Sequence, residues 1–450
     1  MSLSVKTVLE NSKTDPSSIA CVGISNQRET VVAIDKQTGK PYGNAIVWQC
    51  KRTADMCLDI KKDKKLEAYI RKTTGLVVDP YFSGSKIRWL IENHKLQDKV
   101  KSGDVMFMTM DTFLLYKLTG QNMFATEASN ASRTMLMDLQ TGQYDEKLLE
   151  LFGVTNVACL PKIKNSHDQF GQTNNSGMLP DGIAVTGILG DQQAALAGQA
   201  CFKEGEAKCT FGTGAFVLVN KGSDVSPPPT GILNTVAWKI NGKLTYASEG
   251  SCFIAGSAVQ YIRDQLDWIS SSQESETKAS SEPASPDVIF VPALSGLGSP
   301  HWNPNAKGAF LGLTRGTHKS TLTRAAREGI AFQVNDLLDS IQSQTLTIKE
   351  LAVDGGAAAN NLLMQFQSDI SQIKIRRPQS LESTSFGAAV FAAYGAGIIA
   401  DLSEFSEALP MDREFVPNNE PDQLDLNKKQ LEAWQRGVKA VSVFSKVETR

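Results

Sequence analysis

The stretch Gly190-Asp191-Gln192-Gln193-Ala194-Ala195-Leu196-Ala197-Gly198 joins a predicted strand to a predicted helix. An apolar run typical of a strand, residues 183–189, precedes it, and its own Ala- and Leu-rich half favours helix. A carboxylate between a strand's carboxyl end and a helix's first turn lies where open α/β sheets usually bind ligands. Asp191 is therefore a candidate general base. The alternative is a simple N-cap, whose oxygen accepts a backbone N–H of the first turn.

Length and composition indicate a multidomain globular protein. With 450 residues, the chain is too long for one ordinary hydrophobic core, so two or three domains are expected. Its 41% apolar and 21% charged residues are typical of soluble proteins. The 46 basic and 48 acidic residues leave a net charge of −2, so nucleic acid is not expected as a partner.

The cysteines and the hydropathy pattern indicate a cytoplasmic protein. Its seven cysteines form an odd number with no C-x-x-C pair, and only four histidines could help them to build a metal site. A reducing compartment fits best, and no metal site built from the protein alone is expected. No apolar run reaches the ~18 residues of a membrane span, and the N-terminus lacks a signal pattern, so no direct membrane insertion is expected.

The first polar corner of interest carries adjacent opposite charges. Arg28 and Glu29 lie between the β-type runs 19–24 and 30–34, and a third run at 45–48 completes a predicted meander. Arg28 offers a planar fork of donors and Glu29 offers acceptors, which suits a small molecule with neighbouring hydroxyls. The alternative is an exposed ion pair at a strand end, which contributes little to stability.

A tyrosine stands at the start of a predicted helix. Asp79-Pro80-Tyr81-Phe82-Ser83-Gly84 opens a helix that continues to residue 93, with Ser83 as its expected N-cap. Tyr81 would then lie just outside the helix, with its hydroxyl free for a ligand. The alternative is a packed tyrosine whose hydroxyl is satisfied inside the protein.

Two glycine corners follow β-type runs in the second half. Gly212-Thr213-Gly214 joins two such runs, and its glycines allow positive φ and exposed N–H groups, as in a phosphate-binding nest. Gly355-Gly356 ends a strand just before a helix, where a planar ligand can approach the backbone closely. An ordinary hairpin and an ordinary strand-to-helix turn are the alternatives. No Walker-type or G-x-G-x-x-G motif occurs, so a nucleotide site would be of another kind.

Two further stretches carry expectations about local structure. Residues 166–181 are rich in turn formers and predict a surface loop. Residues 270–286 are polar, of low complexity and free of aromatic residues, which predicts a mobile surface connection.

Together these corners resemble the glycerol kinases of the FGGY carbohydrate kinase family, from about residue 19 to about residue 440. The stretches that carry the resemblance are Ser-Asn-Gln-Arg-Glu-Thr (25–30), Ala-Ile-Val-Trp-Gln-Cys (45–50), Asp-Pro-Tyr-Phe-Ser-Gly (79–84), Gly-Asp-Gln-Gln-Ala-Ala-Leu (190–196), Thr-Phe-Gly-Thr-Gly-Ala-Phe (210–216) and Val-Asp-Gly-Gly-Ala-Ala-Ala-Asn-Asn (353–361). The resemblance implies two ribonuclease H-like α/β domains of the actin and hexokinase class, residues 1–197 and 198–450, around a central cleft.

The resemblance also implies an activity, the ATP- and Mg²⁺-dependent phosphorylation of glycerol to sn-glycerol 3-phosphate, by a homo-oligomer (dimer or tetramer). Asp191 would take the proton from the attacking hydroxyl. The residues implied to hold glycerol are Arg28, Glu29, Tyr81, Asp191 and Gln192, with Trp48 and Phe216 as apolar walls. The residues implied to bind ATP or ADP are Gly212, Thr213 and Gly214 at the phosphates, and Gly256, Gln260, Gly356 and Asn360 at the rest of the nucleotide.

The chain departs from the family pattern at two places. Family members begin with a strand pair whose Asp-x-Gly-Thr-type turn contacts the ATP phosphates, and nothing before Ile19 resembles it. The first domain's sheet is therefore expected to lack its leading strands, with an exposed edge or a gap in the core. The alternative function is a catalytically impaired relative that binds polyol or nucleotide and acts as a regulatory or interaction protein. Arg327 also stands where an apolar residue is usual.

Overall fold

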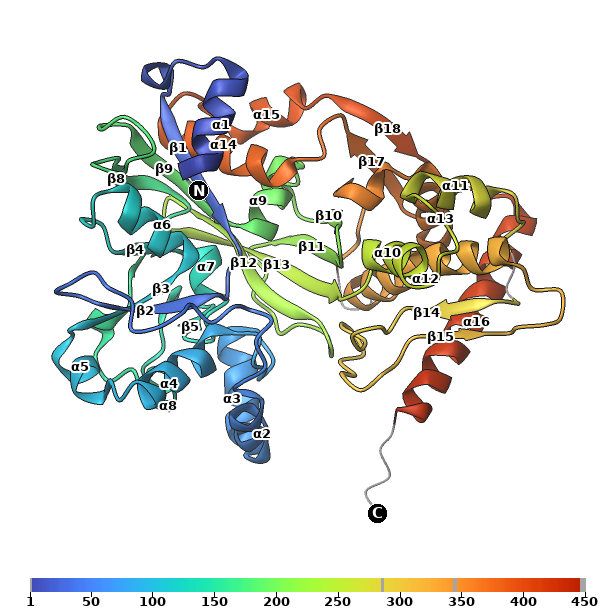
Figure 1. The fold of residues 1–450 in the computed structure, drawn as a ribbon, viewed down its shortest axis with the longest axis horizontal. Helices are drawn as coiled ribbons and strands as arrows, with labels where there is room; N and C mark the ends of the chain where they lie inside the picture. Colours follow the sequence, from blue (N-terminus) through green and yellow to red (C-terminus); the bar gives the residue numbers. More distant parts are fainter. Residues whose placement is uncertain (1, 285–286, 343–345, 446–450) are drawn as a thin grey trace.

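The computed structural model describes residues 2–284, 287–342 and 346–445, which form two α/β halves (Figure 1). The elements before residue 199 are α1 (Ser2–Ser12), η1 (Pro16–Ser18), β1 (Cys21–Asn26), β2 (Val31–Asp35), α2 (Ala54–Lys62), α3 (Lys64–Thr74), α4 (Ser83–Asn93), α5 (Gln97–Ser102), β3 (Val105–Thr109), α6 (Met110–Leu118), β4 (Ala125–Glu127), α7 (Ala128–Ala131), β5 (Met137–Asp138), β6 (Gln143–Tyr144), α8 (Glu146–Leu151), η2 (Val157–Cys159), β7 (Lys162–Lys164), β8 (His167–Gln172), β9 (Ala184–Gly190) and α9 (Asp191–Gly198).

The elements that follow are β10 (Glu206–Phe211), β11 (Ala215–Gly222), β12 (Leu233–Ile240), β13 (Lys243–Cys252), α10 (Gly256–Asp264), α11 (Ser272–Ser280), β14 (Ile289–Val291), β15 (Ala309–Leu311), α12 (Lys319–Gln342), β16 (Glu350–Asp354), η3 (Gly356–Ala359), α13 (Asn361–Ser371), β17 (Lys374–Pro378), α14 (Ser383–Gly395), α15 (Leu402–Ala408), β18 (Met411–Phe415) and α16 (Pro421–Phe444). None of the helices in the described part of the chain combines the length and the hydropathy that a membrane span requires.

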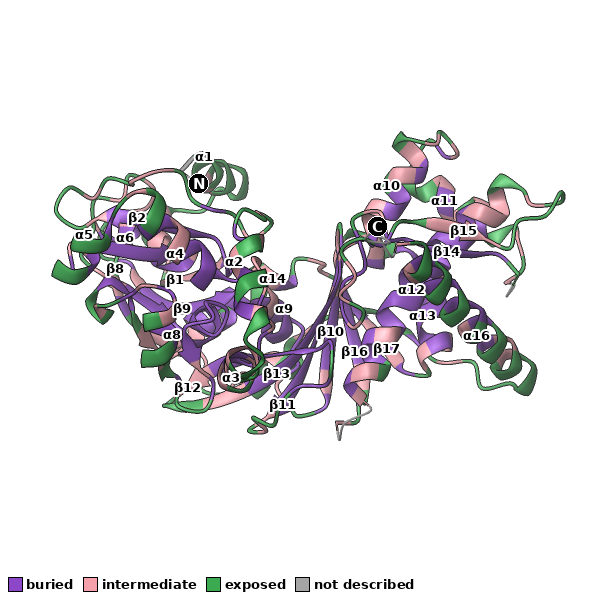
Figure 2. Ribbon diagram, turned by 90° about the horizontal axis from the view of Figure 1, so that it is seen from below, coloured by how far each residue is buried: buried purple, intermediate pink, exposed green. Residues whose placement is uncertain are grey.

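The second half is built on a seven-stranded sheet in the order β12-β13-β11-β10-β16-β17-β18. β10 pairs antiparallel with β11 and parallel with β16, so it stands where the two kinds of pairing meet. Figure 2 shows the buried strands of this sheet between α12 and α13 on one side and α9 and α14 on the other. The strands alternate side chains between these two layers, because successive residues of a strand point to opposite faces.

The first half has a smaller sheet, in the order β1-β9-β8. β1 and β9 run parallel, and their register places Asn26 opposite Gly190. The corner after β1 therefore lies beside the start of α9. Among the described residues, no strand pairs with the other edge of β1, and α14 packs against its face, where a Cβ on Gly23 would lie 2.2 Å from the Ala388 oxygen.

The predicted meander over residues 19–48 is wrong. β2 pairs antiparallel with β3 instead of with β1, and the run 45–48 contributes only the single bridge between Ile46 and Val31. The chain changes direction at Arg28 and Glu29, whose side chains are buried rather than exposed at a turn. The loop predicted over 166–181 is also partly wrong, because β8 occupies its first third and pairs with β9.

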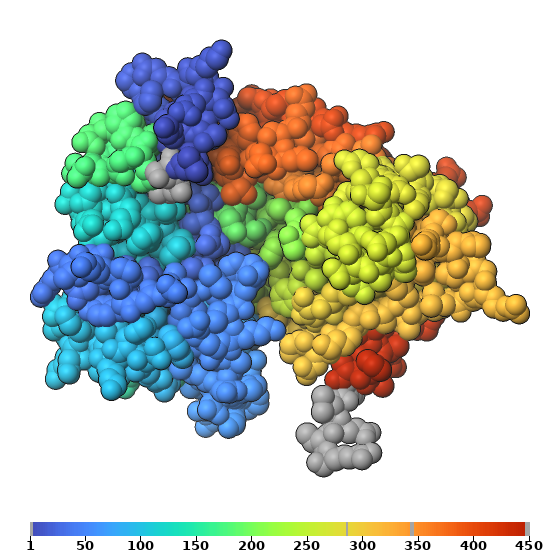
Figure 3. Space-filling view, viewed as in Figure 1, coloured from blue at the N-terminus to red at the C-terminus, as the bar shows by residue number. Residues whose placement is uncertain are grey.

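Helices α9 and α14 cross at very short range between the two sheets. A Cβ on Gly198 would lie 1.9 Å from the Ser383 oxygen, and one on Gly387 would lie 1.8 Å from the Ala194 oxygen. Only glycine permits such an approach of two helix backbones. Figure 3 shows the region around residues 200–250 (green) reaching the surface in the hollow between the two halves.

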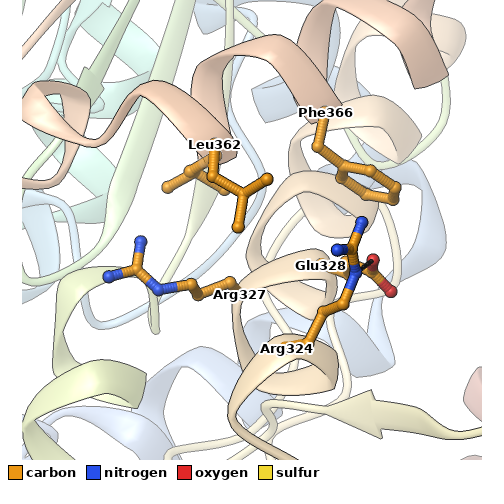
Figure 4. Close-up of a pocket in the computed structure, with 6 residues that line it drawn as sticks. Arg324, Arg327, Glu328, Leu362 and Phe366 are labelled. Atoms are coloured by element: carbon orange, nitrogen blue, oxygen red, sulfur yellow. Dashed lines mark hydrogen bonds and ion pairs between the residues drawn. The ribbon is translucent and has the colours of Figure 1, made fainter. Parts of the chain in front are cut away.

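The low-complexity stretch 270–286 is not simply a connection, because it contains α11; residues 285–286 lie outside the described part. The Ser271 hydroxyl accepts the Glu274 N–H and caps this helix. Arg327 of α12 reaches α11, where it donates to the Ser272 carbonyl at 3.0 Å and contacts the Ser275 hydroxyl. Figure 4 shows Arg327 extending away from the Arg324–Glu328 pair, beside a small cavity. The long side chain of Arg327 thus stabilises helix α11, which composition alone does not predict.

Candidate active site

A buried ionic cluster occupies the corner after β1. Arg28 donates to both carboxylate oxygens of Glu249 on β13, at 2.7 and 2.8 Å. Arg133, which follows α7, donates to Glu29 at 2.8 Å and to Glu249 at 3.1 Å. All four side chains are at most 2% exposed. The alternative of an exposed strand-end pair at Arg28 and Glu29 is therefore excluded.

The charges in this cluster stabilise each other. Burial alone would raise the pKa of Glu249, but Arg133 and Arg28 lower it to about 2. Burial would likewise lower the pKa of Arg28, yet Glu249, Glu29 and Asp191 hold it well above its ordinary value. Both groups are therefore charged at neutral pH. Even so, Arg28 Nε and Arg133 Nη1 have no hydrogen-bond partner among the described residues, although both atoms are buried.

Asp191 is the first residue of α9, and its N-cap position is taken by Gly190. One carboxylate oxygen of Asp191, Oδ1, accepts the Gln192 N–H at 2.8 Å and lies 3.3 Å from Arg28 Nε. The side chain is 35% exposed, the most open of the acidic groups in this cluster. Burial raises its pKa above the ordinary value, which Arg28 only partly offsets. Asp191 thus adjoins the cluster and remains accessible to a ligand.

Two aromatic residues stand beside the cluster. Trp48 and Tyr81 contact each other edge to face, with ring centroids 5.6 Å apart, and the Arg133 guanidinium lies 5.7 Å from the Tyr81 ring. The Tyr81 hydroxyl has no hydrogen-bond partner among the described residues, so the alternative of an internally satisfied tyrosine does not hold. The N-cap of α4 is Phe82, not Ser83, whose hydroxyl donates to the Glu29 carbonyl at 3.1 Å.

One face of the large sheet is directed toward this corner. Thr210 is opposite Phe216 on β11 and opposite Asp354 on β16, and directly paired residues share a face. Phe216 is in turn opposite Ser251, two residues from Glu249 on the same strand. Phe216 is therefore on the face that carries Glu249, and it is half-buried.

The two glycine corners lie close together. A Cβ on Gly256, at the start of α10, would lie 2.6 Å from the Gly212 oxygen and 4.0 Å from the Ala357 Cβ. A Cβ on Gly355 would lie 2.6 Å from the Phe211 oxygen. Gly356 is different, because a Cβ there would meet nothing within 4 Å. The backbone is thus tightly packed around an open position at Gly356.

The geometry of Gly212-Thr213-Gly214 differs from the expected one. These residues form the hairpin between β10 and β11, and neither glycine has positive φ. Glycine is required instead by close packing, since a Cβ on Gly214 would lie 2.5 Å from the Cys252 oxygen. Thr213 is exposed, and its carbonyl accepts the Ala255 N–H at 2.8 Å, which fixes the hairpin against α10.

The last two predicted nucleotide residues lie at helix starts. Gln260 is exposed on α10, one turn after Gly256, so the two share a helix face. Asn360 is the N-cap of α13, and its Oδ1 accepts the Leu363 N–H at 2.7 Å. Its amide nitrogen has no hydrogen-bond partner among the described residues.

Sequence reasoning missed three charged residues of the site. Glu249 and Lys208 lie inside strands, and Arg133 follows a short helix. Each is fully or almost fully buried. For Lys208 and Glu249 the available signal was a charged residue within a strand, because lysine and glutamate are almost never fully buried unless they are paired.

Both halves of the chain match models of one protein family. Two α/β halves with a buried polar corner and two adjoining glycine corners are typical of sugar and polyol phosphotransferases of the actin and hexokinase class. The model of the FGGY carbohydrate kinase N-terminal domain matches residues 1–198, and that of the C-terminal domain matches residues 207–396. The chain belongs to the FGGY family of carbohydrate kinases, which confirms the predicted family and two-domain fold.

Individual relatives agree with this assignment. The chain is 47% identical to the glycerol kinase of Bdellovibrio bacteriovorus over 441 residues, which cover 97% of this chain and 88% of that protein. The crystal structure of Plasmodium falciparum glycerol kinase with ADP superimposes with a TM-score of 0.87 and 38% identity, over 94% of this chain and 83% of that one. The chain also superimposes on a ligand-bound xylulose kinase from Lactobacillus acidophilus with a TM-score of 0.86, over 98% of this chain and 89% of that one. The two sequences are only 21% identical, so this likeness shows the fold alone.

Proposed function

We propose that this kinase transfers the γ-phosphoryl group of Mg–ATP to a terminal hydroxyl of glycerol, and so produces sn-glycerol 3-phosphate and ADP. The observation that carries the proposal is the corner at Arg28 and Glu29, where buried guanidinium nitrogens without a hydrogen-bond partner among the described residues lie next to an accessible carboxylate, Asp191. The glycerol kinases among the relatives support the choice of substrate.

Glycerol binds by its hydroxyls at this corner. Arg28 Nε supplies a donor that has no hydrogen-bond partner among the described residues, and Glu29 and Asp191 supply acceptors. The Tyr81 hydroxyl, which also has no hydrogen-bond partner among the described residues, lies at one side of the proposed glycerol site. A three-carbon polyol needs several donors and acceptors at short range, and burial keeps water from competing for them.

Asp191 acts as the general base. As the terminal oxygen of glycerol attacks the γ-phosphorus, the bond from that phosphorus to the bridging oxygen of ATP breaks, and ADP leaves with its electron pair. The hydroxyl proton passes to the Asp191 carboxylate. Phosphoryl transfer depends mainly on positioning and charge stabilisation. The base therefore needs only to orient the attacking hydroxyl and to accept its proton.

The nucleotide binds at the glycine corners. Gly212, Thr213 and Gly214 contact its phosphates, and the open position at Gly356 admits the rest, next to Gly256, Gln260 and Asn360. Among the described residues, no three His, Cys, Asp or Glu side chains are grouped to hold a metal ion. This fits a Mg²⁺ that enters with ATP, because such an ion is held largely by phosphates and water and neutralises their charge.

We propose that the protein acts in a reducing cellular compartment such as the cytoplasm. All seven cysteines are free thiols in the structure, which supports this assignment. We further propose that residues 1–197 supply most of the polyol contacts and residues 198–450 most of the nucleotide contacts.

The decisive experiment is glycerol-dependent formation of glycerol 3-phosphate by the purified chain with Mg–ATP, beside its Asp191→Asn variant. The expected result is activity in the original chain and a loss of roughly 10²- to 10⁴-fold in the variant, with glycerol binding retained. A variant with full activity would overturn the role of Asp191. Glycerol binding without activity in either protein would favour a binding or regulatory function.

A further inference from the structure

Lys208 is a fully buried lysine on β10. Its Nζ donates to the Oε1 atom of Gln192, at the start of α9, and to the Thr210 hydroxyl at 2.9 Å. The side chain therefore crosses from the strand that leads to the Gly212 hairpin to the helix that begins with Asp191. Lys208 is not among the residues proposed to contact glycerol or the nucleotide.

The surroundings of Lys208 are acidic but do not pair with it directly. Burial lowers the pKa of Lys208, while Asp354, Asp191 and Glu249 favour its charged form. Among the described residues, however, no carboxylate lies within salt-bridge distance of its Nζ. A lysine buried against neutral oxygens costs stability compared with an apolar residue of similar size. Packing alone therefore does not explain it.

The contact with Gln192 has a definite consequence for that side chain. Lysine is a donor only, so it fixes Oε1 of Gln192 as the atom that faces it and leaves the amide nitrogen as the free end. That nitrogen has no hydrogen-bond partner among the described residues, and the side chain is only half-buried. Gln192 follows Asp191 directly, so its free N–H groups are available at the corner of Arg28 and Glu29, where glycerol is proposed to bind.

We propose that Lys208 is a positioning residue: its ammonium holds the Gln192 carboxamide so that Nε2 presents donors to an oxygen of the acceptor alcohol beside Asp191. The inference rests on the proposed phosphorylation of glycerol and adds the residue that orients its acceptor. Without Lys208, the carboxamide is free to rotate, and an acceptor oxygen then meets Oε1 as often as Nε2.

The test is calorimetric binding of glycerol and of ADP to four proteins: the original chain, Lys208→Met, Gln192→Leu and the double variant. Losing one oriented hydrogen bond should weaken glycerol binding about 3- to 10-fold in each single variant, because such a bond contributes about 0.5–1.5 kcal/mol. The affinity for ADP should remain within about twofold. The double variant should bind glycerol no more weakly than Gln192→Leu, since both changes remove the same contact.

Two results overturn the inference while leaving the proposed function intact. One is normal glycerol binding by Lys208→Met, and the other is a double variant in which the two losses multiply. An original chain that binds no glycerol overturns the proposed function and this inference together.

Gln192→Glu tests the same idea without removing the lysine, in case Lys208→Met does not fold. Its carboxylate pairs with Lys208 and has no N–H to offer, so the expected result is an unfolding temperature at least equal to that of the original chain and glycerol binding weakened at least threefold. Unchanged glycerol affinity in Gln192→Glu would exclude a donor role for Gln192, and with it the positioning role of Lys208.

Discussion

Arg28 and Glu249 are 221 residues apart in the sequence and form a two-bonded ion pair, with N–O distances of 2.7 and 2.8 Å. Arg28 follows β1 of the first half, and Glu249 belongs to β13 of the large sheet. The parallel geometry of the two bonds matches the planar guanidinium to the planar carboxylate. The corner at Arg28 and Glu29, which we propose as the glycerol site, thus depends on a contact between the two halves of the chain.

Glu249→Gln should be strongly destabilising. The change removes the negative charge that Arg28 and Arg133 share and leaves two buried cations with Glu29 and the half-exposed Asp191 as their remaining close carboxylate partners. Breaking a buried ion pair in this way costs about 3–5 kcal/mol. Urea denaturation should show this loss in the free energy of unfolding, together with weaker glycerol binding.

The control is Glu92→Gln, which removes an arginine–glutamate ion pair with a single bond on the surface. Glu92 accepts from Arg88 at 2.8 Å, but its side chain is 51% exposed. Solvent screening limits such a pair to under about 1 kcal/mol. Equal losses in the two variants would show that the buried cluster has no special role in stability.

Arg28→Lys should impair glycerol binding although it keeps the positive charge. A lysine cannot make the two parallel bonds to Glu249, and it has no counterpart of the Nε atom that lies 3.3 Å from Asp191. We expect glycerol affinity to fall at least about tenfold, the effect of losing a charge-assisted hydrogen bond of roughly 1.5–3 kcal/mol. ADP affinity should change little. An Arg28→Lys variant with normal glycerol affinity would contradict the assignment of this corner as the glycerol site.

Arg28→Ala should abolish glycerol binding while unfolding remains cooperative.

Local sequence predicted those parts of the site whose geometry depends on neighbouring residues. The strand-to-helix turn at Asp191 and the glycine turns at Gly212 and Gly355 follow from runs of apolar residues with small residues between them. The reason for glycine was predicted correctly only in part. Gly355 has a φ of +85°, whereas Gly214 is required by the close approach of another backbone.

The parts that sequence did not predict depend on pairing over long distances. β1 pairs with β9, and β2 with β3, because each finds its apolar partner far along the chain, and no local pattern specifies that choice. Glu249 likewise acquires its role only when β13 is placed beside the corner of Arg28. Helix α11 was missed because contacts with Arg327 and Arg324 stabilise a segment of weak propensity.

Asp191→Asn should increase stability at neutral pH while it removes catalysis. The pKa of Asp191 is raised in the folded state, so the folded protein binds this proton more tightly than the unfolded chain does. The stability gained from this tighter proton binding is fully present below the pKa of about 3.9 that Asp191 has in the unfolded chain. It is lost as the pH rises through the higher pKa of Asp191 in the folded protein. The asparagine variant should therefore melt at a higher temperature at pH 7, with the difference shrinking as pH approaches 4. Equal melting temperatures at both pH values would contradict this.

Gly356→Ala and Gly355→Ala separate binding from folding at the second glycine corner. A Cβ on Gly356 enters open space, so that variant should keep the original stability within about 0.5 kcal/mol. It should nevertheless weaken ADP binding about tenfold or more, because the methyl group occupies the position where the nucleotide approaches, while glycerol binding stays unchanged. Gly355 has positive φ, and its Cβ would lie 2.6 Å from the Phe211 oxygen, so Gly355→Ala should lose about 1–3 kcal/mol of stability. Thermal unfolding and ADP calorimetry on both variants provide the measurement, and normal ADP affinity in a stable Gly356→Ala would place the nucleotide elsewhere.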